Sequence, residues 1–383
     1  MTTAPVDTQY ALTQDQLDLQ EMIRSFATGT VAPRAAEIDA KAEYPWDIRK
    51  QLGELNLFAL PFSEEYGGLG TGSLMTVIAI EELSKACAST GLMLAVHDLS
   101  SLPIKLFGSE EMKQRVLTRC AAGEWTGAFA LSEPDAGSDP GGMRTHAHLD
   151  GDEWVINGSK NWITNSGVAD FYVVFAVTDR EQGRKTAFLV EADRPGFSIG
   201  KLEHKMGIKG SPTGSPVLED VRVPPENVIG DVGRGMAVAL GTLDHSRLGI
   251  AAQAVGIAQG ATDYAVAYAH ERQQFGQPIF DFQAIQHKLA DMETRTAAAR
   301  ELLYRAAVKC DRDDKDKGKY SAMAKVFGGD TAMAVTVDAV QVLGGYGYVT
   351  EYPVERMMRD AKITQIYEGT QEVQRLVIAR YLK

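Results

Sequence analysis

Apolar residues recur with a helical period near both ends of the chain, and short alternating segments lie between these two regions. Thr13 and Gln16 form a capping box, and the apolar positions that follow predict a helix down to about Thr30. Helical spacing continues to about Trp125, punctuated by prolines and glycines. We therefore expect an all-α domain over residues 1–126.

The pattern changes from about Ala128, where apolar and polar residues alternate over short stretches bounded by turn residues. The dipeptides Asp150-Gly151 and Asn157-Gly158 predict two hairpin turns, because such pairs adopt the tight turns that join antiparallel strands. Further strands are expected at residues 171–176, 186–190, 197–200 and 216–223. These features predict a β domain over residues 127–231.

Helical periodicity then returns and persists to the end of the chain. Long helical segments are expected near residues 234–271, 281–310, 319–344 and 353–382, which would form an antiparallel four-helix bundle over residues 232–383. Small residues crowd the first segment between Gly249 and Ala261, which predicts close helix contacts, most simply within the bundle core. The expected fold class is multidomain α+β, with an N-terminal all-α domain, a middle β domain and a C-terminal four-helix bundle.

Composition places the chain among globular soluble proteins, since 44% of its 383 residues are hydrophobic and 23% are charged. A net charge of -12 argues against nucleic-acid binding, which needs clustered Lys and Arg. Cys87, Cys120 and Cys310 are widely spaced and odd in number, so no disulfide framework is expected. No metal site is expected either, because no cysteine or third histidine lies near His146 and His148.

The start of the chain lacks the basic flank and apolar run of a signal peptide. No stretch approaches the roughly 18 consecutive apolar residues of a membrane span. We therefore expect no membrane insertion and a cytoplasmic location. A mitochondrial matrix protein whose transit peptide had been removed would look the same.

The candidate for chemistry is Glu368, which lies between a β-branched and aromatic stretch and a new helix. Gly369 tolerates dihedral angles that other residues avoid, and Thr370 is expected to cap the helix that follows. A carboxylate on such a short loop, with aromatic and aliphatic neighbours, is a candidate general base with a tunable pKa. From these residues alone, a solvated surface glutamate is the alternative.

Several segments resemble the signatures of the acyl-CoA dehydrogenases, the FAD enzymes of fatty-acid and branched-chain acid oxidation. They follow one another in the order found in that family, and the match covers nearly the whole chain. The segments are residues 130–139, Trp162-Ile163-Thr164-Asn165, residues 272–276, residues 341–345 and Ile366-Tyr367-Glu368-Gly369-Thr370.

The resemblance implies that Glu368 removes the α proton of an acyl-CoA while the flavin N5 takes the β hydride. In the family, the backbone N–H of the base and a ribityl hydroxyl of FAD polarise the thioester carbonyl. Isovaleryl- and long-chain-type relatives place their base directly before the arginine that corresponds to Arg247; this chain has Ser246 there, which leaves Glu368 as the only candidate. The resemblance assigns the acyl-CoA to Ser138, Asp244, Arg247 and Gly369.

The resemblance also implies a set of FAD contacts, in which Trp162 packs on the flavin and Thr164 hydrogen-bonds its ring. Arg272, Gln283 and residues 341–345 would reach the adenosine part across a subunit interface, so a homo-oligomer, expected to be a tetramer, is implied. The cofactor-binding residues expected are Phe129, Leu131, Ser132, Gly137, Ser138, Trp162, Ile163, Thr164, Arg272, Phe275, Gln283, Gln341, Gly344, Gly345, Thr370 and Glu372.

The function implied is dehydrogenation of an acyl-CoA to the trans-2-enoyl-CoA, as in fatty-acid β-oxidation, with electrons passed to an electron-transferring flavoprotein. Similarity is closest to the short-chain, butyryl-CoA type, and short branched-chain substrates stay open. One alternative is an oxidase of the same fold that uses oxygen, although acyl-CoA oxidases are longer. Another is a scaffold without catalytic activity, against which the retained Glu368, Trp162, Thr164 and Arg272 argue.

Overall fold

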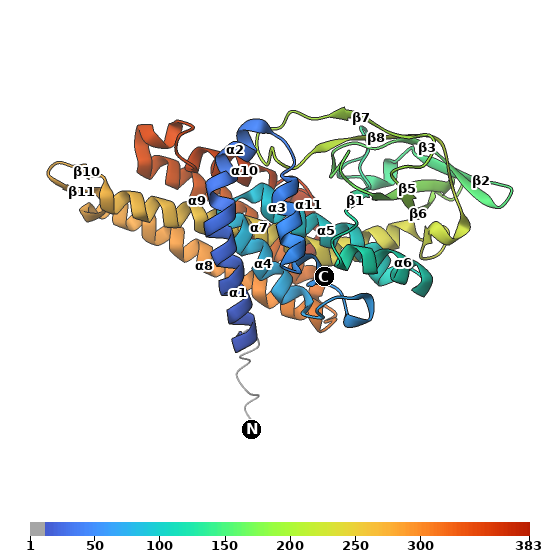
Figure 1. Cartoon of the computed structure of the whole chain (residues 1–383), viewed down its shortest axis with the longest axis horizontal. Helices are drawn as coiled ribbons and strands as arrows, with labels where there is room; N and C mark the ends of the chain where they lie inside the picture. The colour runs from blue at the N-terminus through green and yellow to red at the C-terminus, as the bar shows by residue number, and fades with distance from the viewer. Residues whose placement is uncertain (1–11) are drawn as a thin grey trace, which may run out of the picture.

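The computed structural model describes residues 12–383. Two groups of helices pack against each other on one side of the molecule, and a β-sheet occupies the other side (Figure 1). The helices that precede the sheet in sequence and those that follow it pack together through α4 (Gly72–Ala86), α5 (Ala88–Phe107) and α7 (Gly235–Glu271). The predicted α+β class, helical at both ends with a sheet between, is confirmed.

The N-terminal helices begin as the sequence predicts, since Thr13 caps the first of them in a capping box with Gln16. This helix gives way to a π-helical turn at Ala27–Val31, where the predicted helix was expected to end. The helices α4 and α5 are buried along nearly their whole length and form the hydrophobic interior of this region. The helices are α1 (Gln14–Phe26), α2 (Ala35–Lys41), α3 (Trp46–Glu54), α4 (Gly72–Ala86), α5 (Ala88–Phe107) and α6 (Glu110–Ala121).

The middle region forms a sheet with strand order β4-β8-β3-β2-β5-β6-β9, in which β1 pairs with β5 and β7 pairs with β8. The long strands β5 and β6 are antiparallel, and their apolar side chains supply the interior of this region. The strands are β1 (Gly127–Ala130), β2 (His146–Asp150), β3 (Glu153–Ser159), β4 (Ile163–Thr164), β5 (Phe171–Asp179), β6 (Arg184–Glu191), β7 (Phe197–Leu202), β8 (Thr213–Val223) and β9 (Val228–Ile229).

One of the two predicted hairpin turns is wrong. Asp150 pairs with Glu153 across the tight turn between β2 and β3, as expected. Asn157 and Gly158 instead lie inside β3, at a shift of register against β8. The Asn157 side chain bonds the backbone N–H and the carboxylate of Asp220 on β8, which holds the irregularity in place. The Asn-Gly pair therefore marks a bulge and not a reversal of the chain.

The C-terminal helices form the predicted bundle, whose fourth segment is divided in two by a loop at residues 364–370. A small hairpin, β10 (Gln273–Gln274) and β11 (Gln277–Pro278), joins the first two helices at the end of the bundle farthest from the sheet (Figure 1). The helices are α7 (Gly235–Glu271), α8 (Gln283–Asp311), α9 (Lys317–Leu343), α10 (Val354–Ile363) and α11 (Gln371–Arg380).

The small residues of α7 pack partly within the bundle, where Ala251 and Ala254 meet Gly328 of α9, and partly outside it, which our expectation did not include. A Cβ atom at Gly256 would lie 2.4 Å from the carbonyl oxygen of Glu81, and one at Gly260 would lie 2.5 Å from that of Lys85. Both partners belong to α4. The small residues therefore let α4 of the N-terminal region approach the backbone of α7, which joins the two helical regions into one interior.

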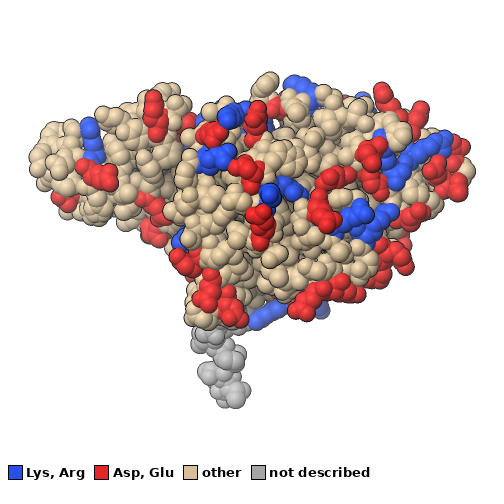
Figure 2. Space-filling model, viewed as in Figure 1, with Lys and Arg blue, Asp and Glu red and all other residues tan. Residues whose placement is uncertain are grey.

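Among residues 12–383, one helical stretch, Lys317–Tyr348, has the length and hydropathy of a membrane span. It is α9 with its 3₁₀ extension, and it packs against α7, α8, α10 and α11, as a core helix does. On the face drawn in Figure 2, Lys and Arg are interspersed with Asp and Glu, and the end that carries the β10–β11 hairpin has few charged side chains.

Candidate active site

Glu368 lies in the loop between α10 and α11 with a backbone φ of 52°, which places it in the left-handed region. Gly369 follows with a φ of 92°. Thr370 caps α11 by accepting a hydrogen bond from the N–H of Val373, as the sequence predicts. Because a left-handed conformation is costly for a residue with a side chain, its presence at the candidate base marks a backbone that the surroundings hold in place.

The carboxylate of Glu368 accepts a hydrogen bond of 2.7 Å from the hydroxyl of Ser246 on α7. Although the residue is partly accessible at the surface, burial of the carboxyl group raises its pKa from 4.5 to about 7. The bond from Ser246 and the charges of Arg247 and Lys325 lower this pKa, and Asp98 raises it, but burial outweighs them. The group is thus poised to gain or lose a proton near neutral pH.

Ser246 stands on the segment of α7 in which acyl-CoA contacts were expected. Arg247 is almost fully buried and bonds Asp244 at 2.9 Å, which orients its guanidinium group. Its Nε atom is buried and has no hydrogen-bond partner among the described residues. A buried donor without a partner is costly, so this atom suits a polar ligand that enters beside Glu368. Of the predicted substrate contacts, Asp244, Arg247 and Gly369 come together here.

The predicted FAD contacts of the sheet region lie on two neighbouring segments, since Asn161 bonds the carbonyl oxygen of Ser132. The hydroxyls of Ser132 and Thr164 bond no other described residue, and neither do the backbone N–H groups of Ser132, Gly137 and Ser138. Such free donors fit a ligand rich in acceptors, as the flavin and pyrophosphate of FAD are.

Trp162 has a positive φ of 61°, and its side chain is 61% exposed. A large aromatic residue that is held in a strained conformation on the surface fits a platform for a planar ligand. The next residue, Ile163, is buried in β4. Phe129 packs on Phe175 within the sheet region. Leu131 lies partly buried at the end of β1.

A buried ion pair supports this surface and was not expected from the sequence. Lys160 is fully buried and bonds Glu133 at 2.7 Å. The same carboxylate accepts hydrogen bonds from the backbone N–H groups of Arg144 and Thr145. The glutamate of the Ser132–Ser138 motif is therefore an anchor that fixes the turn, whereas Ser138 at the end of the motif is exposed.

Most of the remaining predicted FAD contacts lie at the opposite end of the molecule, beside the β10–β11 hairpin (Figure 1). Arg272, Gly344 and Gly345 line one cavity of about 530 Å³, in which the guanidinium lies 5.2 Å from the ring centre of Tyr346. Phe275, at the tip of the hairpin, is 93% exposed. Gln283 and Gln341 are exposed at the ends of α8 and α9, and Thr370 and Glu372 stay beside Glu368 at the start of α11.

A second cavity, of about 270 Å³, lies between α4, α5 and α7. Leu102, Leu248 and Gly249 line it together with Asp98 and His245. Burial raises the pKa of Asp98 to about 6 and lowers that of His245 to about 4. Neither residue was among those expected at the site. No cluster of three possible metal ligands occurs in the described part of the chain.

Family models match the chain along almost its whole length. The N-terminal, middle and C-terminal domain models of acyl-CoA dehydrogenases match residues 13–124, 128–221 and 233–383. The "Acyl-CoA dehydrogenase, short-chain specific" of Clostridium acetobutylicum is 50% identical over 377 residues, covering 97% of this chain and 98% of that protein.

Two solved structures are similar throughout. The butyryl-CoA dehydrogenase of Megasphaera elsdenii is 45% identical with a TM-score of 0.95, covering 97% of this chain and 99% of that one. A chain with the same TM-score of 0.95 and the same coverage is 47% identical; its structure is described as "Electron transferring flavoprotein of Acidaminococcus fermentans: Towards a mechanism of flavin-based electron bifurcation".

Proposed function

The chain belongs to the acyl-CoA dehydrogenase family, and we propose from this that it converts a short straight-chain or short branched-chain acyl-CoA to the trans-2-enoyl-CoA, a step of fatty-acid β-oxidation. The family resemblance drawn from the sequence motifs is thereby confirmed. The short-chain preference is supported by the relatives named above, of which one is short-chain specific and one is a butyryl-CoA dehydrogenase.

The observation that carries the proposal is the buried carboxyl group of Glu368, whose direct contact is a neutral hydroxyl and whose pKa is about 7. A general base works best when its pKa lies near the operating pH, because it is then both ionised and able to accept a proton. Glu368 would remove the α proton of the substrate. Ser246, too weak a base itself, would hold the carboxylate in place.

The backbone N–H of Glu368 has no hydrogen-bond partner among the described residues. It would donate to the thioester carbonyl oxygen, where negative charge develops as the α proton leaves. Arg247 and Asp244 would hold the CoA part, with Ser138 contributing from the sheet side. The carboxylate and the backbone N–H of Glu368 would thus act on adjacent groups of the substrate, the α carbon and the thioester carbonyl.

FAD, when bound, supplies the hydride acceptor at N5, for which no amino-acid side chain can substitute. The free hydroxyls of Ser132 and Thr164, the free backbone N–H groups of residues 137 and 138, and the exposed ring of Trp162 support a flavin site on the sheet region. In this proposal these groups bind and orient the ring system, while Ile163 and Leu131 close its apolar side.

The distance between the two groups of predicted FAD contacts supports a homo-oligomer. Arg272, Gly344 and Gly345 lie at the far end of the bundle from the sheet, so they would reach the adenosine part of an FAD held by another copy (Figure 1). Exposed Phe275 and Tyr348, with few charges around the hairpin, fit a contact between copies (Figure 2). We propose a tetramer built as a dimer of dimers.

An electron-transferring flavoprotein is the proposed electron acceptor, on the strength of the similar chain in the Acidaminococcus fermentans structure. The cytoplasm is the proposed compartment, which agrees with Cys87, Cys120 and Cys310 all being buried and free. We also propose domain boundaries near residues 126 and 231, which fall between α6 and β1 and between β9 and α7.

Replacing Glu368 by glutamine tests the proposed chemistry. The amide has nearly the same shape but cannot take up the α proton, so the rate of flavin reduction by butyryl-CoA without oxygen should fall by about 10² to 10⁴. FAD content and butyryl-CoA binding should stay within about twofold of wild type. Glu301→Gln, an exposed change on α8, is the matched control and should reduce its flavin normally.

Near-normal bleaching in Glu368→Gln would mean that another group is the base. A protein that takes up no FAD would remove the proposal altogether. Oxygen consumption during turnover separates a dehydrogenase from an oxidase, since the dehydrogenase should transfer its electrons to an electron-transferring flavoprotein and consume little oxygen. A panel of acyl-CoA substrates of increasing length and branching, read by the same bleaching, defines the specificity.

A further inference from the structure

The loop that carries Glu368 is fastened by side chains from two helices that play no part in the proposed proton transfer. Gln374 of α11 donates from Nε2 to the carbonyl oxygens of Glu368 and Gly369, at 3.0 and 3.1 Å. Lys325 of α9 donates from Nζ to the carbonyl oxygen of Gly369 at 2.7 Å. The carbonyl oxygens of two successive residues, both with a left-handed backbone conformation, thus accept hydrogen bonds from side chains.

Lys325 is unusual because it is fully buried and has no carboxylate in direct contact among the described residues. Its second hydrogen bond, of 3.2 Å, goes to the side-chain oxygen of Gln371. Burial lowers its pKa to about 8. Lys160, another fully buried lysine, pairs directly with Glu133. Burying an ammonium group against neutral oxygens costs free energy. The position of Lys325 therefore indicates a function other than neutralising a carboxylate in direct contact.

A second anchor on α9 brackets the loop. Asp330 accepts hydrogen bonds from Gln365 before Glu368 and from Gln371 and Arg375 after it, at 2.7, 3.0 and 2.8 Å. The helix approaches closely here, since a Cβ atom at Gly329 would lie 3.0 Å from both the Gln371 amide nitrogen and the carbonyl oxygen of Thr364. The loop is therefore held along its length by one rigid helix.

We propose that Lys325, together with Gln374, is a positioning residue that holds Glu368 in its left-handed backbone conformation, with the carboxylate on Ser246 and the backbone N–H free. This inference rests on the proposed role of Glu368 as the base. Without the two donors, the loop would relax toward dihedral angles that suit a glutamate, and the carboxyl group would leave its place beside α7. A displacement of about 1 Å at a reacting group costs on the order of 10² in rate.

Lys325 also acts on Glu368 through its charge. A change in the pKa of Glu368 therefore distinguishes a positioning role from simple structural support. Lys325 of α9 and Arg247 of α7 lower the pKa of Glu368, whereas Asp98 of α5 raises it. Ser246 of α7 donates to the carboxylate, and Tyr367, which is bonded to Gln253, adjoins it in the chain. The charges of Glu368, Asp330 and Glu372 in turn raise the pKa of Lys325, and that of Arg247 lowers it. Removing the ammonium group should raise the pKa of Glu368.

The test is Lys325→Met in the FAD-loaded protein, which keeps most of the length of the side chain and removes its charge and donor. We expect anaerobic flavin reduction by butyryl-CoA to slow by about tenfold to a hundredfold. The dissociation constant of butyryl-CoA should change by less than about threefold, and the inflection of the rate against pH should move upward. Lys325→Arg, which restores the charge, should return the inflection toward the wild-type value.

The control is Lys288→Met, because Lys288 pairs with Asp338 between α8 and the same helix α9 but lies far along it from the loop. Its rate and inflection should be those of wild type. If Lys325→Met does not fold, Gln374→Met tests the hold on the loop through the rate of flavin reduction, since it removes both bonds from Gln374 to the loop. An unchanged rate and inflection in either folded variant would overturn the positioning role. Glu368→Gln, if still inactive, would show that the base assignment survives that result.

Discussion

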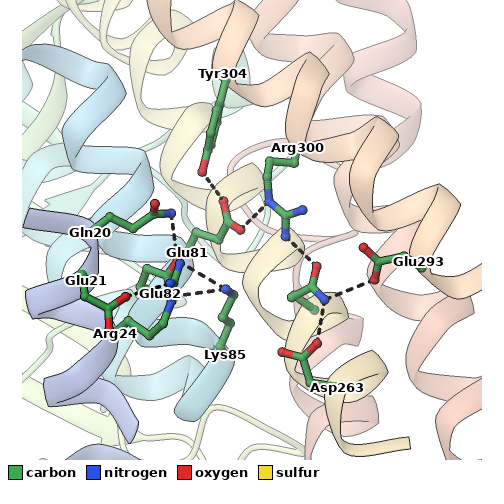
Figure 3. A network of polar contacts seen from close by, with 11 residues as sticks. Gln20, Glu21, Arg24, Glu81, Glu82, Lys85, Asp263, Glu293, Arg300 and Tyr304 are labelled. Carbon is green, nitrogen blue, oxygen red and sulfur yellow. Dashed lines mark hydrogen bonds and ion pairs between the residues drawn. The ribbon is translucent and has the colours of Figure 1, made fainter. Parts of the chain in front are cut away.

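Two glutamates whose carboxyl groups are buried differ in the groups that contact them, and the difference bears on which of them is suited to proton transfer. Glu81 of α4 is 1% exposed and contacts Arg300 at 2.7 Å and the hydroxyl of Tyr304 at 3.0 Å (Figure 3). Glu368 contacts the hydroxyl of Ser246, while Arg247 and Lys325 act on it without a direct ion pair. Glu81 has a guanidinium group in direct contact, whereas Glu368 has none and can change charge near neutral pH.

The surroundings of Glu81 form a continuous network that joins helices distant in sequence (Figure 3). Arg300 of α8 also bonds Gln259 of α7, whose amide in turn bonds Asp263 and Glu293. The adjacent Glu82 bonds residues of α1 and α4, namely Gln20, Arg24 and Lys85. The polar groups satisfy one another, which is the arrangement under which buried charges are tolerated.

The largest effect on stability is expected where the paired carboxylate is removed. Glu81→Gln leaves the guanidinium of Arg300 without its anion at a nearly buried position, and breaking such a pair costs about 3 to 5 kcal/mol. The midpoint of urea unfolding should fall accordingly. Flavin reduction per folded molecule should stay at the wild-type rate, because the network does not reach Glu368.

Glu301→Gln, an exposed change on α8, serves as the control and should leave the urea midpoint unchanged. An unchanged midpoint in Glu81→Gln would show that the network is not what holds α4, α7 and α8 together. A loss of flavin reduction without a loss of stability would remove the distinction between the two glutamates.

Glu368→Gln is expected to raise the stability of the protein, whereas Glu81→Gln lowers it. Its pKa is about 7 in the folded protein against an ordinary 4.5, so the folded state binds more protons between these values and stability falls as pH rises through them. Above pH 7, Glu368→Gln should be more stable than wild type by up to about 3 kcal/mol, and near pH 4.5 the difference should vanish. Urea midpoints at the two pH values measure this; an equal difference at both would contradict it.

Much of the fold follows from the sequence pattern, because the periods of helix and strand differ along the chain. The limits of α7 and the cap on α1 are examples. The Asn157-Gly158 turn was wrong because the local preference of the pair is equally met by a bulge, and pairing with Asp220 on a distant strand decided between them. The small residues of α7 predicted close packing, but periodicity does not say which helix approaches.

The candidate site was predictable only in part. Glu368 and its neighbours stand in a distinctive stretch of sequence, and Thr370 caps α11 as that stretch suggests. Lys325 and Gln374 occupy ordinary helical positions, and what distinguishes them is burial against backbone carbonyl oxygens that come from elsewhere in the chain. Such contacts depend on tertiary packing, so no local pattern in the sequence marks them.

The protonation of Glu368 can be observed directly by infrared spectroscopy. A difference spectrum between wild type and Glu368→Gln, recorded in the FAD-loaded protein without substrate from about pH 5 to about pH 9, isolates the C=O stretch of the protonated carboxyl group. The account predicts that this band is present at low pH and loses half its intensity at a pH of about 7. A band already lost near the ordinary pKa of 4.5 would contradict the claim that burial without direct ion pairing makes Glu368 the base.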